Sequence, residues 1–192
     1  MVGWRHTSTN PIHMKTRLSV LFGAALSLAP LGYAANSNST DNAARVEVLF
    51  DQPENFTDLK DSSMATEKGQ QGYMDSFREY LQENAVRRLP EGQKLSITFT
   101  DIDMAGDFEP WRGPSAQDVR IVKAIYIPRL KFNYSITDAQ GVVVKEGKAN
   151  LADLNFQMNL ATSISNSDSL RYEKHMLDDW MRSELGPKAK KK

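Results

Sequence analysis

The sequence Val119-Arg-Ile-Val-Lys-Ala-Ile-Tyr-Ile-Pro128-Arg-Leu-Lys-Phe-Asn-Tyr-Ser-Ile-Thr137 alternates apolar and polar side chains over most of its length. Such a period of two predicts a β-strand with one buried face. Pro128 cannot donate a hydrogen bond to a neighbouring strand, so it marks an edge position or a bulge that divides the run. The tight turn Asp138-Ala-Gln-Gly141 follows, and residues 142–151 return as a second strand. This hairpin favours an antiparallel sheet.

Four further elements surround the hairpin. Residues 45–50 and 94–103 alternate as strands, whereas 67–89 and 169–185 carry apolar residues at helical spacing. The first helix ends in the cations Arg87 and Arg88, and Trp180 lies on the apolar side of the second. The predicted fold is α+β: a small antiparallel sheet, made of the long hairpin plus two further strands, with two amphipathic helices packed on one face. We expect one domain over residues 45–186.

The N-terminal residues have the features of an export signal. A basic segment at 14–17 precedes the mostly apolar run 18–31, and small residues at 32 and 34 suit cleavage after Ala34. Residues 1–34 are therefore interpreted as a signal peptide with upstream residues, and translation starts at Met1 or Met14. Residues 35–44 predict a flexible spacer, and 187–192 predict a disordered basic tail. We expect a periplasmic protein with no integral membrane segment after the cut.

Composition excludes several chemistries. The 192 residues contain no cysteine, and only one of the three histidines, His175, follows the predicted cut. Disulfides, thiol nucleophiles and the usual zinc sites are therefore excluded from the exported chain. The 24 basic and 24 acidic residues become a net charge of −3 once the leader is removed. Because nucleic-acid binding rewards clustered Lys and Arg, no nucleic-acid partner is expected.

The densest group of charged residues lies in Thr100-Asp-Ile-Asp-Met-Ala-Gly-Asp-Phe-Glu-Pro-Trp-Arg112. If Phe99 faces the core, strand alternation places Asp101 and Asp103 on that same face. Clustered carboxylates near a glycine turn suit Ca²⁺ or Mg²⁺, with Asp101, Asp103, Asp107 and Glu109 as the candidate metal ligands. The match to a calcium loop is partial, because Arg112 stands where a bidentate glutamate belongs. The other interpretations are a structural cluster that pairs with Arg112, Arg120 or Lys123, and acid–base catalysis of a hydrolase type.

Trp111 lies between Pro110 and Gly113. In such a loop an aromatic side chain is either a platform for a sugar or peptide or a plug at one end of the core. Together with its neighbours it gives the candidate ligand-binding set: Asp101, Asp103, Asp107, Glu109, Trp111 and Arg112. No catalytic residue and no further cofactor is predicted.

The chain resembles the domain of unknown function 3016 family of exported proteins of Gram-negative bacteria. The resemblance rests on Val46-Glu-Val-Leu-Phe-Asp51, on Phe56-Thr-Asp58, on 95–106 with Phe108-Glu-Pro-Trp111, and on 119–123, 128–129 and the 138–141 turn. It implies a bacterial periplasmic location but no activity. The sequence thus favours a binding or accessory module of the cell envelope, whose partner is another envelope protein or a cell-wall component. A divalent-cation-binding protein using loop 101–109, and a hydrolase using the same carboxylates, stay open as alternatives.

Overall fold

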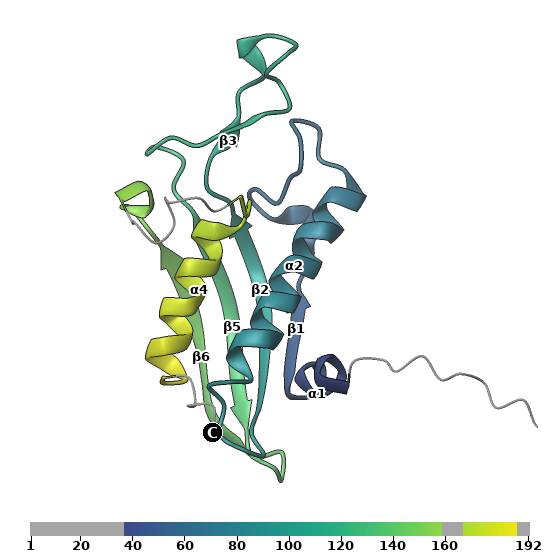
Figure 1. The fold of residues 1–192 in the computed structure, drawn as a ribbon, viewed down its shortest axis with the longest axis vertical. Coiled ribbons are helices and arrows are strands. Elements are labelled where there is room, and N and C mark those ends of the chain that lie inside the picture. The colour runs from purple at the N-terminus through teal and green to yellow at the C-terminus, as the bar shows by residue number, and fades with distance from the viewer. Residues whose placement is uncertain (1–36, 159–166, 188–192) are drawn as a thin grey trace, which may run out of the picture. The chain divides into compact units, whose positions relative to one another are not determined.

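The computed structural model describes residues 37–158 and 167–187 (Figure 1). The predicted signal peptide and the lysine tail from residue 188 lie outside these residues. The main sheet consists of β1 (Val46–Phe50), β2 (Lys94–Asp103), β5 (Arg129–Thr137) and β6 (Val143–Ala152). Its helices are α2 (Glu67–Ala85) and α4 (Arg171–Glu184), and a short helix, α1 (Ser37–Arg45), precedes β1. The remaining elements are β3 (Asp107–Phe108), β4 (Arg120–Ile121) and the 3-10 turns Pro53–Asn55, Pro110–Arg112 and Phe156–Met158. The α+β class predicted from the sequence is confirmed.

The main sheet is mixed rather than purely antiparallel. Its strand order is β1-β2-β5-β6. β5 pairs antiparallel with both β2 and β6, as the hairpin predicts, but β1 pairs parallel with β2. The prediction of an antiparallel sheet is wrong for this edge. Helix α2 connects the two strands from end to end, and such a crossover returns the chain in its original direction.

Helices α2 and α4 lie side by side across one face of the sheet (Figure 1), as predicted. Thr66 begins α2 by accepting a hydrogen bond from the backbone N–H of Gly69. Phe77 of α2 packs on Phe99 of β2, and Trp180 of α4 packs edge-on against Phe132 of β5 at 4.9 Å between ring centroids. All four side chains are buried, so the core lies between the helices and the sheet. Within the described residues, no helix is long and apolar enough to cross a membrane.

Two local predictions need correction. Residues 37–45, expected within or next to a flexible spacer, form α1, and Arg45 at its end donates hydrogen bonds to the carbonyls of Leu89 and Pro90. The long alternating run is divided into β4 and β5 by a full loop, 122–128, rather than by Pro128 alone. Leu170 is the N-cap residue of α4, and its N–H donates to the Asp168 carboxylate.

A β-bulge changes the orientation of the acidic residues. The pairing of β2 with β5 shifts register between Phe99 and Asp101, and the next buried side chain is Ile102. Asp101 and Asp103 consequently lie opposite Lys131 and Arg129 on the face that the helices do not cover. The prediction that they share a face with Phe99 is wrong, because one extra residue reverses the alternation.

Candidate functional site

The candidate site is the protruding loop, residues 104–128, which extends beyond the end of the main sheet (Figure 1). The short strands β3 and β4 pair antiparallel within it. Gly106 begins it with φ 83°, and a Cβ there would lie 2.9 Å from the carbonyl oxygen of Ile121. Only glycine tolerates both this backbone conformation and this close approach. Its N–H donates to the carbonyl of Tyr126, which closes the base of the loop.

A largely buried ion pair anchors the protruding loop to the body of the protein. Both terminal nitrogens of Arg120 donate to the carboxylate of Asp58, at 2.7 and 3.1 Å. The same guanidinium donates to the carbonyls of Lys60 and Gly106, and it stacks 4.6 Å above the ring of Phe108. Such a bidentate contact sets the geometry of both partners. Arg120 therefore holds the loop against the segment that follows β1.

A second ion cluster organises the outer part of the protruding loop around Glu109. Its carboxylate accepts hydrogen bonds from Lys123, from Arg112 and, at 2.9 Å, from the hydroxyl of Tyr126. These partners cover it, so that Glu109 is only 1% exposed although it is remote from the main core. The hydrogen bonds from Lys123 and Arg112 lower the pKa of Glu109 to about 2. The carboxylate thus stays ionised and holds two cations.

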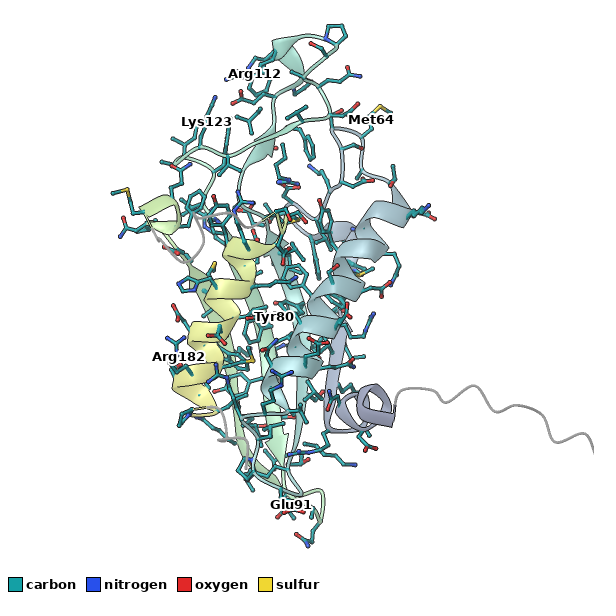
Figure 2. All side chains as sticks on the ribbon, in the orientation of Figure 1. Met64, Tyr80, Glu91, Arg112, Lys123 and Arg182 are labelled. Atoms are coloured by element: carbon teal, nitrogen blue, oxygen red, sulfur yellow. The ribbon has the colours of Figure 1, made fainter. Side chains whose placement is uncertain are left out.

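Trp111 lies next to this cluster and faces solvent. It is 73% exposed, so it does not plug the core. Val119 and Ile125 of the same loop are also exposed. Met64 is 82% exposed on the adjoining segment, where Ser63 donates to the Asp118 carboxylate at 2.8 Å. Figure 2 shows Arg112 near the outer end of the loop and Met64 lower and to the right, on the adjoining segment.

The acidic residues of the candidate set go to separate partners. Asp101 accepts hydrogen bonds from Lys131 and from the N–H of Thr57, whereas Asp103 pairs with Arg129. Partial burial alone would raise the pKa of Asp101, but these hydrogen bonds outweigh that effect, so the pKa is lowered. The pKa of Asp103 is raised, because burial is the larger effect there. Asp107 accepts from the N–H of the next residue. The described part of the chain contains no group of three or more His, Cys, Asp or Glu side chains placed to hold a metal ion.

Two of the candidate acids meet at the base of the protruding loop. Asp103 and Asp107 line one polar cleft of about 200 Å³, together with Asp58, Tyr126 and Arg129. Asp101 and Glu109 do not line it. The structure thus separates the candidate set into three places: the uncovered sheet face, this cleft, and the outer loop with Glu109, Trp111 and Arg112.

Three residues that position the loop were not among the sequence candidates: Asp58, Tyr126 and Glu173. Asp58 lies in a predicted loop, and its partner Arg120 is 62 residues away. Glu173 of α4 is fully buried and accepts a hydrogen bond from the N–H of Ala105. In the sequence, Glu173 is visible only as a charged residue among the apolar positions of the second helix. Helical spacing alone does not tell whether such a residue is buried or exposed to solvent.

These features define an α+β protein: a mixed sheet covered on one face by two helices, with an anchored loop that exposes a tryptophan. The chain belongs to the family described as Protein of unknown function (DUF3016), whose family model matches residues 44–183. The resemblance noted from the sequence is confirmed. Neither the search of curated proteins nor the search of solved structures found a match.

Proposed function

We propose that this protein is a binding or accessory module of the bacterial cell envelope, which contacts another envelope protein through the protruding loop. The observation that carries the proposal is the exposure of Trp111, at 73%, on a loop held by ion pairs at its base and at its outer part. Tryptophan, arginine and methionine are enriched at the energetic centres of protein interfaces. Trp111 and Arg112 supply two of these residue types side by side in the loop, and Met64 supplies the third on the adjoining segment.

Preorganisation strengthens the argument for binding. A loop that is already ordered loses little conformational entropy when a partner docks, and more of the contact energy then appears as affinity. Glu109 and Arg120 provide this order independently of each other. The exposed apolar side chains of Val119 and Ile125 in the same loop favour a protein partner over a cell-wall glycan.

The proposed location is the periplasm, reached by cleavage after Ala34. The support is the order of basic segment, apolar run and small residues in 14–34. Osmotic-shock fractionation followed by intact-mass measurement tests it. A released protein that begins at Ala35 is the expected result. A protein that stays with the cytoplasm and keeps its leader would refute this part of the proposal.

A photoreactive amino acid at position 111, in living cells, tests the binding site. The matched control carries the same group at Leu154, which is 71% exposed but lies outside the protruding loop. We expect a discrete protein adduct at 111 that is absent at 154 and is competed by the unlabelled protein but not by its Trp111→Ala variant. An adduct to glycan would show that the partner is a cell-wall component and not a protein. Equal labelling at both sites, or none at 111, would refute the assignment.

A further inference from the structure

The free edge of the main sheet is unusually long. β6 forms this edge, and no described strand pairs with its outer side. It has ten residues, contains no proline and is exposed or half-buried throughout. The opposite edge, β1, has five residues and lies next to α1. A long edge without proline presents a row of backbone groups that another strand can pair with, unless charges prevent it.

The charges on β6 have a specific pattern around Gly147. Glu146 and Lys148 flank this glycine, and both project from the face that the helices do not cover, opposite Ser135 and Asn133 of β5. These neutral neighbours do not compensate either charge. Gly147 faces the helices, and a Cβ there would lie 2.9 Å from the hydroxyl oxygen of Tyr134, so a larger residue would displace this side chain. The centre of the edge is thus a glycine between a negative and a positive side chain.

We propose that a second copy of this chain pairs antiparallel along β6, with the two-fold axis at Gly147. In this register Glu146 of each copy lies opposite Lys148 of the other, which gives two complementary charge pairs on one face of a continuous eight-stranded sheet. Opposite charges placed directly across two strands stabilise the pairing. A two-fold axis at residue 146 would set Glu146 against Glu146, and one at 148 would set Lys148 against Lys148. The charges therefore select the register at Gly147.

The other face of the edge is compatible with this pairing. Lys145, which would lie opposite Ala149 of the second copy, is already neutralised by Glu184 of α4 at 2.7 Å. A groove of about 830 Å³ lies between β6 and α4, and Trp180 is among the residues that line it. A second copy extends the sheet at this border and brings its own α4 alongside, which gives a self-complementary interface of the kind that two-fold dimers use.

Charge reversal tests the register. Protein is purified after expression of the full chain, and its dimer dissociation constant is measured by sedimentation at low salt. We expect a dimer at about 100 μM or below, and at least about a tenfold weaker dimer for Glu146→Lys and for Lys148→Glu alone. An equimolar mixture of the two single variants restores the dimer as a heterodimer, because every opposed pair is then complementary. The double variant restores it as a homodimer.

Two controls keep the outcome decisive. Thermal melting monitored by circular dichroism identifies a variant that fails to fold, and Trp111→Ala leaves the dimer unchanged, since the protruding loop does not take part. A wild-type protein that is monomeric over the whole concentration range overturns the proposal. So does a dimer that neither reversal weakens, or one that the mixed variants fail to restore.

Discussion

Glu173 of α4 accepts a hydrogen bond through Oε1 from the backbone N–H of Ala105, at 2.7 Å, where both residues are buried. The bond ties α4 to the first residues of the protruding loop. The other carboxylate oxygen, Oε2, has no hydrogen-bond partner among the described residues. Burial raises the pKa of Glu173 to about 7, although the bond from Ala105 and the charges of Arg120 and Arg171 favour the ionised form. The loop is thus attached through a group that titrates near neutral pH.

Stability should therefore depend on pH through Glu173. The unfolded carboxyl loses its proton near its usual pKa of 4.5, whereas the folded one keeps it to about 7. The free energy of unfolding then falls as the pH rises through this window, by on the order of 3 kcal/mol in total. We expect Glu173→Gln to remove most of this fall. Urea unfolding at about pH 5 and about pH 8 measures it.

The exposed Glu79 provides the control for this experiment, because Glu79→Gln removes a carboxyl without touching a buried group. Carboxyls with a lowered pKa, such as Glu109, change stability only below about pH 4.5. They therefore do not contribute to the change between about pH 5 and about pH 8. A Glu173→Gln variant that keeps the full pH slope would show that another group causes it.

Two consecutive arginines, Arg87 and Arg88, follow α2, and only Arg88 is expected to contribute to stability. Arg88 is buried and donates to the Asp178 carboxylate at 2.6 Å and to the carbonyl of Gly186 at 3.0 Å, whereas Arg87 is exposed. We expect Arg88→Ala to lower the free energy of unfolding by about 2–3 kcal/mol, because the Asp178 carboxylate then loses its buried ion-pair partner. Arg87→Ala should change it by less than about 0.5 kcal/mol. Equal losses in denaturant melts would contradict the assignment.

The sequence predicted where each major strand and helix lies in the chain better than it predicted what the side chains of that element contact. β2 begins and ends where the alternation does, because every second side chain from Leu95 to Phe99 meets the helices. The bulge after Phe99 has no local signal: Thr100 and Asp101 are neither glycine nor proline, and the shift is visible only against β5. Alternation alone therefore put Asp101 on the wrong face.

The sequence predicted which segment forms the candidate site but not how its side chains are arranged in space. Glu109, Trp111 and Arg112 do lie together, since they are close in sequence. Arg120 and Asp58 could not be paired from the sequence, because their contact depends on how the loop returns to the sheet. The direction of β1 was missed for a similar reason: the hairpin was visible in the sequence, whereas the crossover through α2 is a tertiary feature.

Divalent cations should leave stability unchanged. Asp101 and Asp103 already pair with Lys131 and Arg129, and Glu109 holds two cations in the protruding loop. A bound ion would have to displace these partners, and Asp101 and Glu109 lie outside the cleft that Asp103 and Asp107 line. We expect millimolar Ca²⁺, Mg²⁺ or EDTA to shift the melting temperature by less than about 1 °C. A rise that saturates with cation concentration would instead establish a site.

Substitution of the two tryptophans that follow the leader should affect stability to very different extents. Trp180 is 6% exposed and packs edge-on against Phe132 and Tyr134, whereas Trp111 is 73% exposed. Trp180→Ala should cost about 3–5 kcal/mol of unfolding free energy, and Trp111→Ala less than about 0.5 kcal/mol. In the Trp180→Phe background, acrylamide should quench the emission of Trp111 nearly as well as that of a free indole. Strong protection of Trp111 in the isolated protein would contradict its exposed position.

The order of the protruding loop should depend on Glu109. A neutral glutamine keeps one acceptor but no charge, so it cannot hold Arg112 and Lys123 together. We expect Glu109→Gln to speed trypsin cleavage after these two residues by on the order of tenfold, because cleavage follows local opening. Cleavage after Lys131, inside β5, should not change.

Glu91→Gln is the matched control for this experiment. Glu91 is exposed at the opposite end of the described part from Arg112 (Figure 2), so its charge has no part in the loop. Mass spectrometry of the fragments over time distinguishes the sites. Faster cleavage at Lys131 as well would mean that Glu109 stabilises the whole domain, and an unchanged rate at Arg112 and Lys123 would mean that Arg120 and Gly106 hold the loop without it.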